Sequence, residues 1–374
     1  MKTTFLFLSI ILMSGIFLAQ KSIAQGSIPD VAVGAPDPQL SQWDNDYLDR
    51  QAAVFLDSVK AVIGKYPPVL KEIKERTYAK LLLDAVFHEK YAAFRKPAQD
   101  FFHSQTAIII SELEQTKVKS GARIWKVYDM GFIVRTKTVT IAFDLVSGAT
   151  SRSRDFALND AELNRLVDQC DVLFISHKHA DHAEKAVAGR FIRSGKPVVS
   201  PEQVWKNDSI SSKILHPERS ADKAHQIKLS ENRQLSAVIF PGHQMASTDN
   251  NCVVVTTPEG ITLAHIGDQI NEEDFMGDFE WIDQVAKKHK TDILMTNAWT
   301  MDIFRIVKGF DPKLVLPGHE LELGHPVWDR LPYWGDDAWL KLNFAELKAS
   351  KYPVVALIWG ESFEYLTKKI NTKL

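Results

Sequence analysis

The sequence predicts an α/β protein in which a helical N-terminal segment precedes a sheet-rich domain with interleaved helices. Between about residues 39 and 115, apolar residues recur at helical spacing, and after Lys117 the pattern changes to short strands. The all-apolar run at 172–175 is typical of a strand buried on both faces of a sheet. With 374 residues, the chain has room for one large or two smaller folding units.

The composition excludes several classes of protein. Hydrophobic residues make up 45% and charged residues 25%, as in globular proteins, which excludes a disordered, collagen-like or polytopic membrane protein. A net charge of -2 gives no general attraction to nucleic acid or acidic membranes. The two cysteines, Cys170 and Cys252, are too few for a disulfide framework. We expect both to be buried free thiols, with a disulfide as the alternative in an exported protein.

The N-terminus resembles a cleavable secretory signal. Lys2 precedes an apolar run at 5–19, and the small residues Ser22 and Ala24 form a cleavage site. A membrane anchor is the alternative, but the run is shorter than the roughly 20 residues that span a bilayer. We therefore expect residues 1–24 to be removed from an exported protein, periplasmic or secreted, with no integral membrane segment afterwards.

Residues 25–117 are expected to form a helical N-terminal extension. A Gly-, Pro- and Asp-rich leader comes first, and Gly64 to Pro68 interrupts the helical pattern. Three helices are predicted, at about 39–63, 70–85 and 97–113. The extension contains no cluster of metal-ligand residues, and its role stays open.

Residues 118–374 are expected to form the sheet-rich domain. Runs of β-branched and aromatic residues between turn signals predict strands at 124–128, 132–135, 139–143, 172–175, 196–200, 236–240, 252–257, 261–266, 292–296 and 314–316. Amphipathic patterns predict helices at 160–169, 183–194, 281–289 and 337–349.

Directly after the strand at 172–175 lies a His-x-His-x-Asp-His pattern, formed by His177, His179, Asp181 and His182. His177 and His179 alternate at a strand end, so their imidazoles can leave the backbone on one side. The chain then turns, so that Asp181 and His182 can reach a second metal-binding position close to the first. Neutral imidazoles and a carboxylate suit zinc and related divalent ions, and two metals sharing such a site lie about 3.5–4 Å apart.

Three later residues are further candidate ligands: His243, Asp268 and His319. Each follows an apolar strand and lies next to a glycine, which lets backbone and metal approach closely. Four ligands in one loop cannot complete two metal shells, so the fold must bring these additional ligands in.

From about residue 118 onwards, the order of these motifs resembles that of metallo-β-lactamase-fold metallohydrolases. The resemblance implies a four-layer αβ/βα sandwich with the helical N-terminal extension attached. It also implies two divalent metal ions, most commonly Zn²⁺, with Mn²⁺ or Fe²⁺ as alternatives. By the resemblance, the first metal is bound by His177, His179 and His243. The second metal is bound by Asp181, His182 and His319, with Asp268 bridging both. Asp144 matches the family's carboxylate that orients a metal-bound histidine.

Departures from the motifs of individual subfamilies reduce the number of subfamilies that this chain resembles. Zinc β-lactamases usually have a cysteine where Asp268 stands, and commonly lack the histidine that is His182 here. The flavodiiron group has a carboxylate in place of His179. The stretch 250–268 is similar to the broad lactonase and phospholipase-D-like branch, which includes ascorbate-6-phosphate lactonase and N-acylphosphatidylethanolamine phospholipase D.

The resemblance implies a hydrolase in which a metal-bridging hydroxide attacks an ester, lactone or phosphodiester, with Asp181 and Asp268 orienting the nucleophile. We expect a small-molecule or lipid-like substrate and no nucleic acid, because the mature chain is acidic. The alternatives are a non-catalytic metal-binding or assembly module of the same fold, or an iron oxidoreductase.

Trp299, His325 and Arg330 are candidate substrate-binding residues, because they follow strands or ligands at the same end of the sheet. Arg330 is suited to an anionic group of the substrate. The alternative is that these aromatics cover the core and that His325 lies in a surface loop. The identity of the substrate and the oligomeric state stay open.

Overall fold

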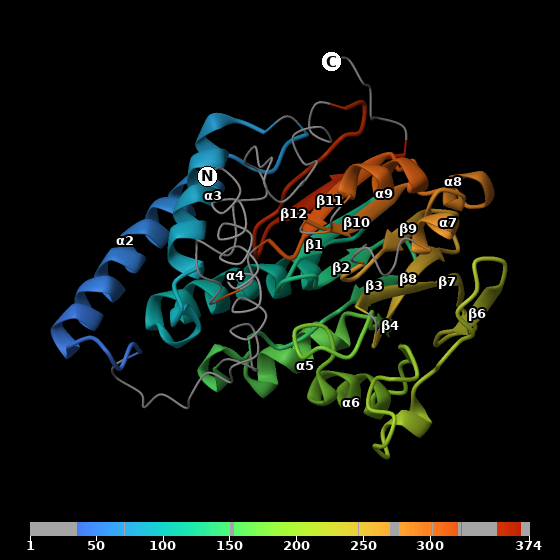
Figure 1. Cartoon of the computed structure of the whole chain (residues 1–374), viewed down its shortest axis with the longest axis horizontal. Helices are drawn as coiled ribbons and strands as arrows, with labels where there is room; N and C mark the ends of the chain where they lie inside the picture. Colours follow the sequence, from blue (N-terminus) through green and yellow to red (C-terminus); the bar gives the residue numbers. More distant parts are fainter. Residues whose placement is uncertain are drawn as a thin grey trace, which may run out of the picture.

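The strands in the described part of the chain form two six-stranded sheets that lie face to face, with helices on both outer sides (Figure 1). The computed structural model describes residues 36–70, 72–149, 153–245, 247–269, 277–298, 300, 302–320, 323 and 350–367. Within these residues the helices are α2 (Gln42–Lys65), α3 (Lys74–Phe87), α4 (Lys96–Gln115), α5 (Asp160–Asp168), α6 (Lys185–Arg193), α7 (Asp278–Ile282), α8 (Val285–Lys288) and α9 (Ile303–Phe310).

The first sheet has the strand order β12-β1-β2-β3-β4-β5, and β3, β4 and β5 run parallel. Its strands are β1 (Ala122–Lys126), β2 (Phe132–Arg135), β3 (Thr140–Phe143), β4 (Val172–Phe174), β5 (Val198–Val199) and β12 (Ser362–Tyr365). The second sheet has the order β11-β10-β9-β8-β7-β6, and β9, β10 and β11 run parallel. Its strands are β6 (Ala224–Lys228), β7 (Gln234–Met245), β8 (Thr248–Thr256), β9 (Thr262–His265), β10 (Ile293–Asn297) and β11 (Leu314–Gly318).

Strand residues alternate between two apolar layers, because successive side chains point to opposite faces of a sheet. In β4, Val172 and Phe174 pack between the sheets, whereas Leu173 packs against the helices outside the first sheet. In β10, Met295 packs between the sheets and Leu294 packs against the helices outside the second sheet. Three apolar layers therefore separate four structural layers, and the predicted αβ/βα sandwich is confirmed.

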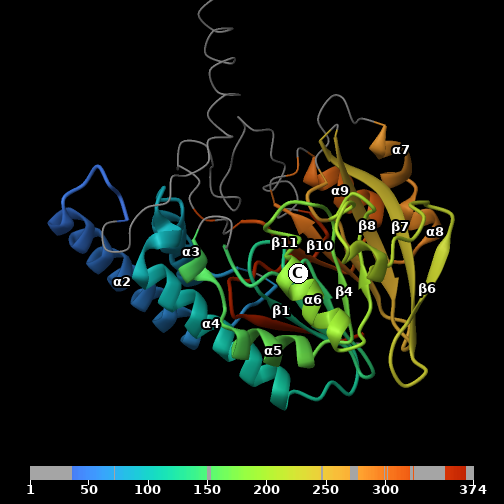
Figure 2. The same ribbon diagram turned by 90° about the horizontal axis from the view of Figure 1, so that it is seen from below.

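The N-terminal helices α2, α3 and α4 form part of the helical layer that covers the first sheet (Figure 2). Phe87 of α3 stacks on Trp359 at 4.5 Å between ring centroids, and Phe102 of α4 lies edge-on to the same indole at 5.4 Å. Gln105 donates a hydrogen bond from Nε2 to the Trp359 carbonyl (2.9 Å). The three helices thus share one core with α5 and α6, so the extension contributes to the main fold.

A buried ion pair fixes α3 to the start of β12. Both guanidinium Nη atoms of Arg76 bind the Glu361 carboxylate, at 2.6 and 2.7 Å, and the two side chains are only 1% and 6% exposed. Removing one partner of a buried pair leaves the other charge without compensation.

We expect Arg76→Ala to lower the free energy of unfolding by about 3–5 kcal/mol, because Glu361 would stay buried as an unpaired anion. Chemical denaturation monitored by circular dichroism measures the effect. Arg165→Ala is the control, because Arg165 makes a similar two-point contact with Glu114 in solvent, with side chains 52% and 35% exposed. Equal loss in both variants would contradict the structural role of the buried pair.

The described structure departs from the sequence predictions in several elements. His243 was expected beyond the end of a strand, but β7 continues to Met245 because its pairing with β8 extends past His243. The helix expected at 281–289 is divided into α7 and α8, and β6, β12 and α9 were not predicted.

Some predictions fall on residues that the structure does not describe: the signal at 1–24 and the helix at 337–349. Among the described helices, none combines the length and the apolar character needed to cross a membrane.

Candidate metal centre

The candidate metal ligands lie where the carboxyl ends of parallel strands from both sheets meet. His177 follows β4 in the first sheet, while Asp268 follows β9 and His319 follows β11 in the second. The two sheets touch here directly: a Cβ added to Gly267 would lie 2.4 Å from the Cβ of Ser176. The sandwich thus brings residues more than a hundred positions apart into one place.

Four side chains form a compact set of donor atoms, which we call the four-donor set: Asp181, His182, Asp268 and His319. His182 Nε2 lies 3.1 Å from Asp181 Oδ2 and 3.2 Å from Asp268 Oδ2. His319 Nε2 lies 3.5 Å and 3.2 Å from the same two oxygens. In a tetrahedral zinc site with bonds of about 2.0–2.1 Å, neighbouring donors lie about 3.3 Å apart. The four-donor set therefore fits a divalent metal ion.

The other predicted ligands are assembled less closely. His177 Nε2 lies 3.7 Å from Asp268 Oδ2, and the His177 ring centroid lies 4.1 Å from that of His182 and 4.7 Å from that of His179. Among the described residues, two groups have donor atoms that all lie within 4.8 Å of one another, and neither includes His179 or His243. The groups are Asp129, Asp181, His182 and His319, and His177, His182 and Asp268. Asp268 Oδ2 nevertheless faces His177 on one side and His182 and His319 on the other, as a bridging ligand would.

Both oxygens of Asp268 are held by neutral donors. Asn297 donates from Nδ2 to Oδ1 (3.0 Å), and Gln244 donates from Nε2 to Oδ2 (3.0 Å). The Asp268 backbone N–H donates to Asn250 Oδ1 (3.2 Å). Because these partners come from β10, β7 and β8, the carboxylate is fixed by three strands of the second sheet.

The buried Asp144 carboxylate anchors the loop that carries the His-x-His-x-Asp-His pattern. Its carboxylate accepts hydrogen bonds from Ser176 N (2.7 Å) and Ser176 Oγ (2.6 Å), and it lies 2.7 Å from His182 Nδ1. A proton on Nδ1 leaves the lone pair of Nε2 for a metal. This geometry fits the orienting role that the family resemblance implies for Asp144.

The electrostatics of the centre favour a cation. Burial lowers the pKa of His182, but Asp268, Asp181 and Asp144 outweigh it, so that the pKa lies well above its usual value. Positive charge is thus stabilised at the point where a metal ion would lie. For His177, burial together with the charge of His182 lowers the pKa to about 3, so its imidazole is neutral near pH 7. Burial opposes ionisation of Asp268, yet His182 and His319 hold its pKa well below the usual value.

Nε2 of His177 and Nε2 of His182 are buried and make no hydrogen bond to the part of the chain that the structure describes. Buried polar groups normally have partners, and an exception calls for an ion or a water. A bound metal ion would satisfy both nitrogens, in agreement with the donor geometry.

Sequence reasoning missed several residues of the centre. Gln244 contacts Asp268, Asp278 contacts His243, and Asp129 lies beside His319. His265 lies two residues before Gly267 but is packed: it is 1% exposed and its Nε2 lies 3.0 Å from the Met130 carbonyl. The predicted substrate residues Trp299, His325 and Arg330 lie outside the described residues.

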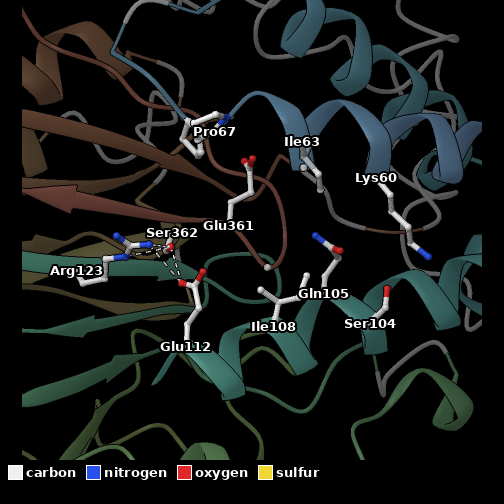
Figure 3. Close-up of a pocket in the computed structure, with 13 residues that line it drawn as sticks. Lys60, Ile63, Pro67, Ser104, Gln105, Ile108, Glu112, Arg123, Glu361 and Ser362 are labelled. Atoms are coloured by element: carbon white, nitrogen blue, oxygen red, sulfur yellow. Dashed lines mark hydrogen bonds and ion pairs between the residues drawn. The ribbon is translucent and has the colours of Figure 1, made fainter. Parts of the chain in front are cut away.

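A cavity of about 510 Å³ lies away from the metal ligands, between α2, α4 and the start of β12 (Figure 3). Ile63, Pro67 and Ile108 form apolar walls, and Lys60 and Arg123 lie at its sides. None of its lining residues belongs to the candidate centre, so the cavity is not the substrate site expected beside the metals.

No family model matches the chain, and no curated protein matches it. Among solved structures, the chain is similar to a metallo hydrolase from the archaeon Ignicoccus hospitalis, with 16% identity and a TM-score of 0.44; the match covers 66% of this chain and 100% of that one. It is similar to a diiron β-hydroxylase from Streptomyces venezuelae, with 12% identity, a TM-score of 0.44, and 67% and 55% of the two chains covered. It is also similar to a metallo-β-lactamase-fold protein from Bacillus subtilis, with 12% identity, a TM-score of 0.39, and 66% and 100% covered. At these values the similarities assign no activity, and function has to be inferred from the donor atoms of the centre.

Proposed function

We propose that the protein is a metal-dependent hydrolase whose centre binds up to two divalent metal ions. The observation that carries the proposal is the four-donor set, in which Nε2 of His182 and Nε2 of His319 each lie 3.1–3.5 Å from Oδ2 of both Asp181 and Asp268. Nitrogen and oxygen donors of this kind suit Zn²⁺ first, with Mn²⁺ or Fe²⁺ as alternatives. The sequence resemblance to metallo-β-lactamase-fold metallohydrolases supports the same conclusion.

Bound divalent ions would supply a Lewis acid and a water molecule of lowered pKa. The protein provides the orientation. Asn297 and Gln244 fix Asp268, while Asp144 fixes His182 through Nδ1. Asp181 is the most exposed member of the four-donor set, with a side chain 22% exposed, so its carboxylate is the one best placed to orient incoming water.

The proposed substrates are esters, lactones or phosphodiesters of small-molecule or lipid-like character. These compounds share an electrophilic carbon or phosphorus that water can attack. The lactonase and phospholipase-D-like branch is the subfamily favoured by the stretch 250–268. A non-catalytic metal-binding module and an iron oxidoreductase are the alternative outcomes of the test.

The test is a hydrolysis assay of the purified mature chain against p-nitrophenyl esters, p-nitrophenyl phosphodiesters and a panel of lactones. We expect turnover of at least one class, abolished by a chelator and restored by Zn²⁺ or Mn²⁺. Metal binding without turnover would favour the non-catalytic module, and redox activity that depends on iron would favour the oxidoreductase.

We also propose that the protein is exported after removal of residues 1–24, on the basis of the basic start, the apolar run and the small residues Ser22 and Ala24. The intact mass of the exported protein tests this. A mass that includes residues 1–24 would contradict cleavage.

A further inference from the structure

Three histidines of the candidate centre each direct Nδ1 towards a carboxylate. The pair formed by His182 and Asp144 is the one that the family resemblance implies. In the other two, His319 Nδ1 lies 3.4 Å from Asp129 Oδ1, and His243 Nδ1 lies 3.1 Å from Asp278 Oδ1. We propose that Asp129 and Asp278 are positioning residues, each of which holds one histidine with Nε2 turned towards a different metal ion. This inference rests on the proposed metal centre and deepens it.

Asp129 contacts His319 from the opposite sheet. It lies in the turn between β1 and β2, is completely buried, and adopts a left-handed conformation with a φ of 52°. The Asp129 carbonyl accepts hydrogen bonds from the His319 backbone N–H (3.2 Å) and from the ammonium group of Lys126. One residue of the first sheet therefore accepts a hydrogen bond from the His319 backbone and also places its carboxylate 3.4 Å from the His319 ring.

The conformation of His319 shows why such support is needed. His319 follows β11 with a φ of 66°, a left-handed conformation that a side chain larger than glycine rarely adopts. Surrounding contacts must maintain this conformation. The contacts with Asp129 do so, and they leave Nε2 facing Asp181 and Asp268 at 3.5 and 3.2 Å.

Asp278 holds His243 in a comparable way within the second sheet. It is the first residue of α7, and its side chain is 7% exposed. Asp278 Oδ2 accepts hydrogen bonds from the backbone N–H of His243 (3.0 Å) and from Nε2 of Gln269 (2.6 Å). Both carboxylate oxygens lie within 3.2 Å of His243 Nδ1, so backbone and ring are again fixed together.

The two carboxylates should act on different metal ions. His319 belongs to the four-donor set, whereas the resemblance assigns His243 to the first metal, with His177 and His179. A carboxylate behind a ligand imidazole fixes its tautomer and raises its basicity, and its loss weakens metal affinity by about 10- to 100-fold. Each substitution should therefore weaken one binding step and spare the other.

The test is a titration of the metal-depleted full chain with Zn²⁺ in competition with a chromophoric chelator. The wild-type chain should bind two equivalents. Asp129→Asn and Asp278→Asn should each weaken one equivalent by about 10- to 100-fold and leave the other within about threefold. Asp129→Glu, which keeps the carboxylate, should recover part of the affinity.

Asp292→Asn is the matched control, because Asp292 is 1% exposed and immediately precedes β10, at the end of the second sheet opposite to the centre. Its titration should match that of the wild type. The visible spectrum of the Co²⁺-loaded Asp129→Asn variant should also match the wild type, because a positioning residue is not itself a ligand; a changed coordination spectrum would overturn the positioning role.

Unchanged affinities in both variants would overturn the inference while leaving the metal centre intact. Failure of the wild type to bind metal would instead overturn the proposed function. If Asp129→Asn does not fold, as shown by circular dichroism, the Asp278→Asn titration decides the inference.

Discussion

Replacing Asp268 by Asn should abolish hydrolysis and release metal from the centre. The carboxylate oxygen Oδ2 lies 3.2 Å from Nε2 of both His182 and His319, and 3.7 Å from Nε2 of His177. Asn has the same shape but no negative charge, so the carboxylate that faces His177, His182 and His319 would lose its charge. A bound metal contributes several kcal/mol to transition-state stabilisation, and about 4 kcal/mol corresponds to roughly a 10³-fold loss in kcat/KM.

The measurement for Asp268→Asn is kcat/KM on the best substrate of the hydrolysis panel, together with the metal content of the same sample. Asp171→Asn is the control, because Asp171 binds Thr140 N and Arg233 just before β4, away from the metal ligands. A variant that keeps both activity and metal would show that Asp268 does not bridge the centre.

Gly267→Ala should destabilise the protein and disturb the metal centre together. Gly267 has a φ of 51°, and a Cβ there would lie 2.4 Å from both Asn250 Oδ1 and the Ser176 Cβ, and 2.5 Å from Ser176 Oγ. Ser176 is hydrogen-bonded to Asp144, and Asn250 anchors the Asp268 backbone, so neither can move without displacing ligands. Overpacking of this kind costs about 1–3 kcal/mol, in addition to about 1–2 kcal/mol for the left-handed conformation.

Gly260→Ala separates the two contributions to that cost. Gly260 has a φ of 79°, but nothing lies within 4 Å of an added Cβ. The control therefore carries the conformational cost alone and should keep its metal affinity. Chemical denaturation and the Zn²⁺ titration measure both variants. If Gly267→Ala matches Gly260→Ala in stability and affinity, the two sheets are not in tight contact at the centre.

The local part of the metal site could be predicted from the sequence because its spacing is visible along the chain. His177, His179, Asp181 and His182 lie within six residues after one strand. His319 was found because a glycine and an apolar strand precede it. These residues come together only because the two sheets pack face to face. No local pattern in the sequence specifies this packing, which was expected from the family resemblance.

The remaining residues could not be predicted because their signal lies in tertiary contacts. Asp129 is a single carboxylate in a turn, and only the packing of the opposite sheet brings His319 to it. β12 is a short edge strand whose Ser362, Phe363 and Glu364 are not fully buried, so it has no apolar run. α9, in contrast, does have a helical pattern in the sequence: Ile303, Ile306, Val307 and Phe310 recur at helical spacing.

The central claim is that the four-donor set binds a divalent metal ion. Elemental analysis of the full mature chain, after reconstitution with Zn²⁺ or Mn²⁺ and dialysis, tests it most directly. The donor geometry predicts at least one tightly held equivalent and up to two, with a loss in a His182→Ala variant that remains folded. Less than one equivalent in the wild-type chain, not restored by either metal, would contradict the claim.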